Sequence, residues 1–130
     1  MNMPVSSQDR LVIENVFKAM QTGPSAENQL LGLFHKDGVL MEPFTGQMQT
    51  HQGIAAIKAS LVPMWANQAP DMKIVLDRVD LLGNQLRAEW TCTSSVMPGP
   101  MRGFDMFQID RGKVKRLEIN ITEMPDFGGQ

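Results

Sequence analysis

Residues 101–122 read MRGFDMFQIDRGKVKRLEINIT, and this stretch decides the fold class. Apolar and polar residues alternate on both sides of the segment 110–112, which is rich in turn-forming residues. Such alternation is typical of β-strands with one buried face, and the turn residues indicate that two strands fold back on each other. The sequence therefore predicts an antiparallel hairpin of strands 101–109 and 113–122.

The turn of this hairpin sets which residues face each other across the two strands. A two-residue loop would place Arg111 at a positive φ, which is unfavourable for a residue with a side chain. A three-residue loop avoids this, because its first two residues form a type I turn and Gly112 takes the left-handed position. The longer loop is therefore predicted, and it places Asp105 opposite Leu117.

Two further strands are predicted before the hairpin. Residues 72–82 and 85–97 alternate in the same way, with Gly83-Asn84 as the turn between them. Pro98-Gly99-Pro100 then leads into the hairpin. The four strands together are expected to form an antiparallel meander.

The first half of the chain has apolar residues at helical spacing instead. This spacing predicts helices over 7–20, over 25–34 and from Gly53 to a kink or end at Pro63. Residues 39–41 are expected to form a brief strand. Helices first and a meander last predict an α+β fold, in which three helices cover the concave face of a curved antiparallel sheet.

Length and composition exclude several classes of protein. Residues 1–130 are expected to form a single domain with a loose tail at 125–130. The net charge of −2 and the lack of a Lys/Arg run argue against nucleic-acid binding. A polar start and no segment of ~20 apolar residues predict a cytoplasmic protein that is neither exported nor membrane-bound. A lone Cys92 and two separated histidines predict neither a disulfide nor a metal site.

Asp105 is the first candidate functional residue. On the predicted register it shares a strand face with Met101, Phe107 and Ile119, and Trp90 of the preceding strand joins that face. An ionised carboxylate is costly to remove from water, so this group is exposed, paired, or protonated with a raised pKa. A register error that leaves Asp105 on the wet face, or a structural pair with a base, remains the alternative.

Glu42 is the second candidate functional residue. It follows the predicted strand 39–41 and precedes Pro43, so its carboxylate can point into the mouth of a pocket. A solvated glutamate in a turn would have the same sequence context, and this alternative stays open. Both histidines are predicted to lie at the surface, His35 near a helix C-terminus and His51 in a polar loop.

Three segments together resemble a known family. They are 33–44 (LFHKDGVLMEPF), Gly53-Ile54 at the start of the third helix, and 104–114 (FDMFQIDRGKV). They resemble the SnoaL-like and steroid delta-isomerase branch of the nuclear-transport-factor-2-like superfamily, and the similarity spans nearly the whole chain. It implies a cone-shaped, cystatin-like roll in which helices close a curved antiparallel sheet around an apolar pocket.

The resemblance also implies roles for the two carboxyl groups. In the ketosteroid isomerases, the carboxylate just before the proline of this strand is the general base, and Glu42 has that place. A protonated aspartic acid in their penultimate long strand donates to the oxyanion, and Asp105 matches it. Their oxyanion tyrosine has no counterpart here, because the chain contains no tyrosine.

These features predict a cofactor-free proton-transfer enzyme, of isomerase or cyclase type, that acts on a small hydrophobic carbonyl compound. Glu42 would take a proton from carbon, and a protonated Asp105 would donate to the enolate. The alternative is a non-catalytic module that binds a lipophilic molecule or serves as a dimer scaffold. A homodimer is expected from the family and from Phe104 and Met106 on the outer sheet face. The predicted pocket wall is apolar and consists of Phe17, Phe34, Met41, Trp65, Trp90, Met101, Phe107, Leu117 and Ile121.

Overall fold

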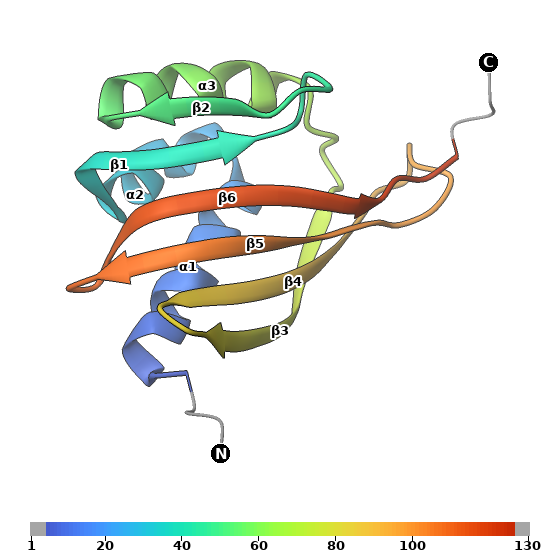
Figure 1. Cartoon of the computed structure of the whole chain (residues 1–130). Coiled ribbons are helices and arrows are strands. Elements are labelled where there is room, and N and C mark those ends of the chain that lie inside the picture. The colour runs from blue at the N-terminus through green and yellow to red at the C-terminus, as the bar shows by residue number, and fades with distance from the viewer. Residues whose placement is uncertain (1–4, 127–130) are drawn as a thin grey trace.

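The computed structural model describes residues 5–126, and in this range the chain forms helices packed on one curved six-stranded sheet (Figure 1). The strand order is β2-β1-β6-β5-β4-β3. The elements in chain order are α1 (Ser7–Thr22), the 3-10 helix η1 (Pro24–Ala26), α2 (Glu27–Gly32), β1 (Phe34–Glu42), β2 (Gln49–Gln52), α3 (Ile54–Ala66), β3 (Lys73–Leu82), β4 (Gln85–Thr93), β5 (Met101–Asp110) and β6 (Lys113–Glu123).

The sheet confirms the predicted α+β class. Strands β3 to β6 form the expected antiparallel meander. Strand β1 returns to pair with β6 in parallel, while β2 pairs with β1 in antiparallel orientation, so the complete sheet is mixed. Helices α1 and α2 lie behind the sheet in Figure 1, and the opposite face of the sheet turns toward the viewer.

Helix α1 closes the inner face of the sheet, as its sequence predicts. Ser6 caps its first turn by accepting a hydrogen bond from the backbone N–H of Asp9 at 3.1 Å. The helix ends at Gly23, whose φ of 95° a residue with a side chain rarely adopts. Its apolar stripe includes Ile13 and Val16, both completely or almost completely buried. This stripe packs on the inner sheet face and forms part of the core.

The second predicted helix is shorter than its sequence pattern indicates. Helix α2 ends at Gly32, and Phe34 already begins β1 by pairing with Val114 of β6. The backbone N–H of Val114 donates to the carbonyl oxygen of Leu33 at 2.7 Å, and this sheet pairing outweighs the local helical spacing. His35 therefore lies in a strand and not at a helix end, so that prediction is wrong.

Another prediction about the first half is also wrong, because the stretch expected to be a polar loop contains β2, an edge strand of the sheet. Of the two alternatives predicted at Pro63, the end of the third helix is wrong, because α3 continues to Ala66, and the kink stays a prediction. The last turn of α3 is held from outside the helix: the indole Nε1–H of Trp65 donates to the carbonyl oxygen of Met20 at 3.0 Å.

The hairpin between β5 and β6 differs from the predicted one. Its loop has two residues, because Asp110 pairs with Lys113, and φ is 54° at Arg111 and 79° at Gly112. Two positive φ angles are typical of a type I′ turn, whose twist matches that of the flanking strands. The predicted three-residue loop is therefore wrong, since strand pairing outweighs the local cost of a left-handed arginine.

A bulge nevertheless keeps the side chains from Gly103 to Gln108 on their predicted faces, whereas Val114, on the turn side of the bulge, is buried in the core. The pairing with β6 shifts by one residue between Gln108 and Ile109. Asp105 consequently lies opposite Ile119 and not opposite Leu117. The shorter loop and the bulge together move the pairing by two residues, and because side chains alternate with a period of two the inner and outer faces are unchanged.

None of the helices between residues 5 and 126 is long and apolar enough to cross a membrane. The predicted loose tail, 125–130, falls mostly outside the described residues.

Candidate active site

A cavity of about 400 Å³ lies between α1, α3 and the inner face of the sheet. Glu42 and Asp105 both line it, from two different strands. The rest of its lining is largely apolar and consists of Val16, Phe17, Met20, Phe44, Thr45, Ser60, Pro63, Met64, Asn67, Gln68, Met72, Ile74, Trp90, Cys92, Met101 and Ile119. Within residues 5–126, no three His, Cys, Asp or Glu side chains are grouped so that they could hold a metal ion.

Asp105 lies on the buried face of β5, so the alternative that it faces solvent is wrong. It is only 5% exposed and has Ala88 and Ile119 as its neighbours on the adjoining strands. The indole Nε1–H of Trp90 donates to its Oδ1 at 2.8 Å. Burial raises the pKa of Asp105 from 3.8 to about 8, and the hydrogen bond from Trp90 only partly opposes this.

The hydrogen bond from Trp90 also determines which oxygen of Asp105 can donate. An indole N–H is a donor only, so Oδ1 must act as the acceptor. Asp105 is mostly neutral at pH 7 with a pKa of about 8, and its proton then sits on Oδ2. The Oδ2–H group is left to donate to another acceptor. A neutral acid with one oxygen occupied is thus held at the wall of the cavity.

Trp90 can take this position because its neighbour on β5 has no side chain. Trp90 pairs directly with Gly103 across the two strands. A Cβ atom at Gly103 would overlap the indole ring of Trp90 and the carbonyl oxygen of Asn120. The absence of a side chain at Gly103 therefore allows the indole to reach Asp105.

Gly103→Ala is expected to destabilise the protein by about 3 kcal/mol, because the added methyl group overlaps backbone as well as a packed ring. Urea unfolding at pH 7 measures the change in free energy. Gly99→Ala is the matched control, since a Cβ there would meet only the Cβ of Pro125 at 3.9 Å. Equal stability of the two variants would contradict the close packing of Trp90 on Gly103.

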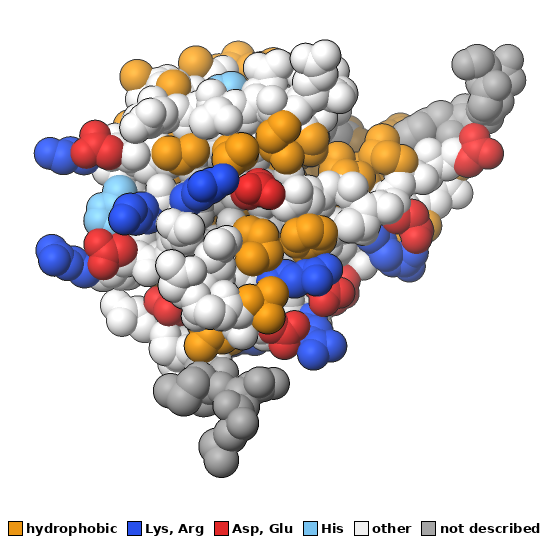
Figure 2. Space-filling model, viewed as in Figure 1, with side chains coloured by type: hydrophobic (Ala, Val, Ile, Leu, Met, Phe, Trp, Pro, Cys, Tyr) orange, Lys and Arg blue, Asp and Glu red, His pale blue; other side chains and the backbone are white. Residues whose placement is uncertain are grey.

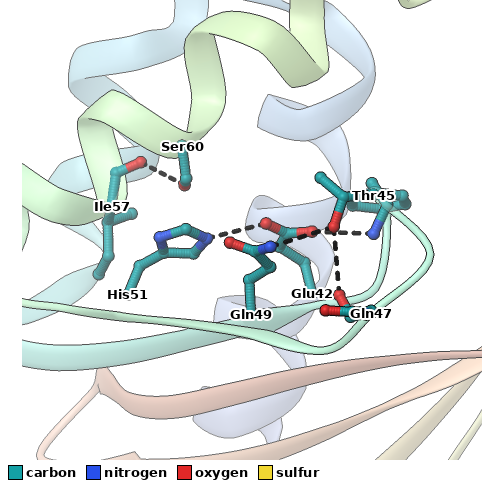
Figure 3. Close-up of polar contacts among 8 residues, drawn as sticks. Glu42, Thr45, Gln47, Gln49, His51, Ile57 and Ser60 are labelled. Carbon is teal, nitrogen blue, oxygen red and sulfur yellow. Dashed lines mark hydrogen bonds and ion pairs between the residues drawn. The ribbon is translucent and has the colours of Figure 1, made fainter.

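Glu42 ends β1, and its carboxylate is held at both oxygens. The backbone N–H of Phe44 donates to Oε1 at 2.8 Å, and Nε2 of His51 lies 2.8 Å from Oε2 (Figure 3). Gln49 lies directly opposite Glu42 on β2, and His51, two residues further along, shares the same face. The alternative of a solvated turn glutamate is therefore wrong, because Glu42 is buried and belongs to a strand.

The sequence interpretation missed the contact between His51 and Glu42. Residues 49–52 are polar throughout, so they lack the alternation of apolar residues by which a strand is recognised. As an edge strand β2 packs few side chains into the core, and three of its four residues are exposed. The only local feature that could have predicted β2 was the polar turn before it, which allows the chain to return alongside β1.

The residues of the predicted pocket wall fall into three groups in the structure. Phe17, Trp90 and Met101 line the cavity beside the two carboxyl groups. Met41 lies on the outer sheet face, where its Sδ is 3.1 Å from Nη2 of Arg116. The remaining five residues do not line the cavity and pack in or against the core around it: Phe34, Trp65, Phe107, Leu117 and Ile121.

Cys92 was not predicted to line the cavity but does so. Burial raises the pKa of its thiol, so the side chain is a neutral, weakly polar part of the wall. Methionines 20, 64 and 72 line the same cavity from three other segments. The wall is therefore formed by flexible apolar side chains that can adjust to the shape of a ligand.

Similar solved structures share this fold at low sequence identity. A proposed ketosteroid isomerase from Kribbella flavida DSM 17836 is 15% identical, with 96% of this chain and 85% of that chain covered and a TM-score of 0.69. A proposed SnoaL-like polyketide cyclase from Jannaschia sp. CCS1 is 12% identical, with coverages of 93% and 90% and a TM-score of 0.72. A protein of cystatin-like fold from Methylobium petroleophilum PM1 is 14% identical, with coverages of 98% and 84% and a TM-score of 0.69.

The family of the protein follows from the match of its sequence to a family model. No curated protein matches the chain. The model of the SnoaL-like domain matches residues 13–117, from the middle of α1 into β6. Because this match spans most of the chain and agrees with the fold, the protein belongs to the SnoaL-like domain family.

Proposed function

We propose that this protein is a cofactor-free proton-transfer enzyme that acts on a small hydrophobic carbonyl compound. The observation that carries the proposal is that Glu42 and Asp105 line one apolar cavity, with Asp105 kept neutral by burial. A base and a hydrogen-bond donor in one dry site are what enolisation of a ketone requires. The ketosteroid isomerase and polyketide cyclase descriptions of two similar structures agree with this class of chemistry.

The proposed reaction moves one proton. A carboxylate oxygen of Glu42 takes the proton from the carbon next to the carbonyl, and the electron pair of that C–H bond forms the enolate. The Oδ2–H of Asp105 donates a hydrogen bond to the enolate oxygen, where negative charge develops. Glu42 then returns the proton to the same carbon or to a conjugated one.

The absence of tyrosine from the chain makes Asp105 the important donor in this scheme. The ketosteroid isomerases, which the sequence resembles, use a tyrosine together with the protonated aspartic acid. Here Asp105 is oriented by Trp90, which donates to its other oxygen. A single donor gives less stabilisation of the enolate than two, so we expect substrates whose α-protons are already fairly acidic.

Hydrogen–deuterium exchange of 2-tetralone, a flat apolar ketone with acidic α-protons, tests this function. The protein is mixed with 2-tetralone in D2O, and loss of the α-proton signal is followed by NMR. Exchange faster than in buffer with the same amount of an unrelated protein is the expected result. Binding of 2-tetralone without faster exchange would overturn the enzyme and support the alternative, a non-catalytic module for lipophilic molecules.

We also propose that the protein forms a homodimer through the outer face of the sheet. Figure 2 shows hydrophobic side chains on this face interleaved with charged ones. Phe104 and Met106 are only half-buried there, and the Arg87 guanidinium lies 4.2 Å from the centre of the Phe104 ring. A second copy can cover these half-buried apolar groups.

Sedimentation velocity at micromolar concentration is expected to give a species of twice the 14.5 kDa chain mass. Met106→Asp should shift the protein to the monomer, because it introduces a charge at the centre of the proposed interface. Met124→Asp is the control, since Met124 is exposed beyond the end of β6. A wild-type protein that sediments only as a 14.5 kDa species would exclude the dimer.

A further inference from the structure

His51 contacts the proposed base but not the cavity. Its Nε2 lies 2.8 Å from Oε2 of Glu42, while His51 itself is not among the residues that line the cavity. The side chain of His51 is 20% exposed, compared with 11% for Glu42. His51 comes from β2, the edge strand, whereas Glu42 comes from its inner neighbour β1. The imidazole therefore contacts the carboxylate from an edge strand and is itself partly exposed to solvent.

The two partners of the Glu42 carboxylate differ in what they can do with a proton. The backbone N–H of Phe44 can only donate, so it orients Oε1 and cannot carry a proton away. An imidazole has two nitrogens and can accept a proton at one while it releases another from the second. Of these two partners, only His51 can connect Glu42 to bulk water by proton transfer.

We propose that His51 carries protons between Glu42 and the solvent, so that the hydrogen removed from the substrate exchanges with water before the reaction ends. This inference rests on the proposed function, in which Glu42 is the base. His51 is a positioning and relay residue, because it acts through Glu42 and does not touch the substrate. Without the relay, Glu42 would return the same hydrogen that it removed.

The proton balance of the relay is simple. When Glu42 is a carboxylate, Nε2–H of His51 donates to Oε2, and the second ring nitrogen carries no proton. To accept the substrate proton from Glu42, His51 first changes tautomer by exchange with water: the second nitrogen takes a solvent proton and Nε2 gives up its own. Nε2 then accepts the substrate proton while the second nitrogen releases its proton to water, so the carboxylate and the first tautomer are restored and one proton has left. A further exchange with water replaces the hydrogen at Nε2 by one from the solvent, and the reverse transfer then passes this solvent proton to Glu42 and the enolate.

Isomerisation of cyclohex-3-enone to cyclohex-2-enone in D2O tests this inference. Enone absorbance measures turnover, and mass spectrometry measures deuterium in the product after low conversion. The wild-type protein is expected to incorporate close to one deuterium per turnover. His51→Gln keeps an N–H donor for Oε2 but has no second nitrogen for the relay. We expect it to lower deuterium per turnover at least fivefold while turnover itself falls by less.

The control is His35→Gln, because Nε2 of His35 is hydrogen-bonded to the carbonyl oxygen of Asp110 and does not line the cavity. It should leave both turnover and deuterium content unchanged. Deuterium per turnover is a ratio, so a general loss of structure in a variant does not alter it. Unchanged deuterium in the His51 variant, or little deuterium in the wild-type product, would overturn the relay while the enzyme proposal stands. Failure of the wild-type protein to act on both cyclohex-3-enone and 2-tetralone would overturn the enzyme proposal and the relay with it.

Discussion

Replacing Asp105 by Asn is expected to stabilise the protein on the order of 4 kcal/mol at pH 7 and very little at pH 4. Burial raises the pKa of Asp105 to about 8, whereas the group has its ordinary pKa of 3.8 in the unfolded chain. Between these two pH values the unfolded chain ionises Asp105 and the folded protein does not. The wild-type protein therefore loses stability as pH rises from about 4 to 8. The Asn variant has no charge in either state and is free of this loss.

Urea unfolding at several pH values between 4 and 8 measures the difference between the two proteins. The Asn side chain can still accept from Trp90 and still offers an N–H to the cavity, so packing is preserved. Asp37→Asn is the control, because Asp37 is exposed; its stability should follow the wild-type protein at each pH. If the free energies of unfolding of the wild-type protein and the Asp105 variant change with pH in parallel, Asp105 is ionised in the folded protein at pH 7.

The sequence predicted those parts of the fold that depend on local chemistry. Helix α1 has a capping serine, an apolar stripe and a terminal glycine, and all three features act within the helix itself. The inner face of β5 was also predicted correctly, although the turn that was used to derive it was wrong. A period of two allows only two faces, so an error of two residues in register leaves the face unchanged.

Features that depend on contacts between distant segments could not be predicted in this way. Phe34 continues the helical spacing of α2, but pairing with Val114, eighty residues further along the chain, places it in β1. His51 belongs to an edge strand that has no apolar pattern of its own. Alternation also cannot distinguish a residue that lines the cavity from one that is buried in the core. Phe107 shares a strand face with Asp105 but lies in the core, because the packing of the helices decides which part of that face borders the cavity.

Glu42→Gln is expected to lower kcat for α-proton exchange of 2-tetralone by about 10²- to 10⁴-fold, the range that general base catalysis supplies. The amide has nearly the shape of the carboxylate but cannot take a proton from carbon. Its carbonyl oxygen can still accept from the backbone N–H of Phe44. The apolar walls are unchanged, so KM should stay within about threefold, because mutation of a group that acts only in the transition state affects kcat alone.

The matched control for this prediction is Glu118→Gln, which makes the same chemical change on the outer sheet face, where the carboxylate accepts from Arg116 at 3.3 Å. It should exchange 2-tetralone as fast as the wild-type protein. Thermal unfolding of both variants checks that neither has lost its fold. Exchange by a folded Glu42→Gln variant at the wild-type rate would show that Glu42 is not the base. In that case the apolar cavity would be better explained as a binding site without turnover, in which Asp105 donates a hydrogen bond to a ligand oxygen.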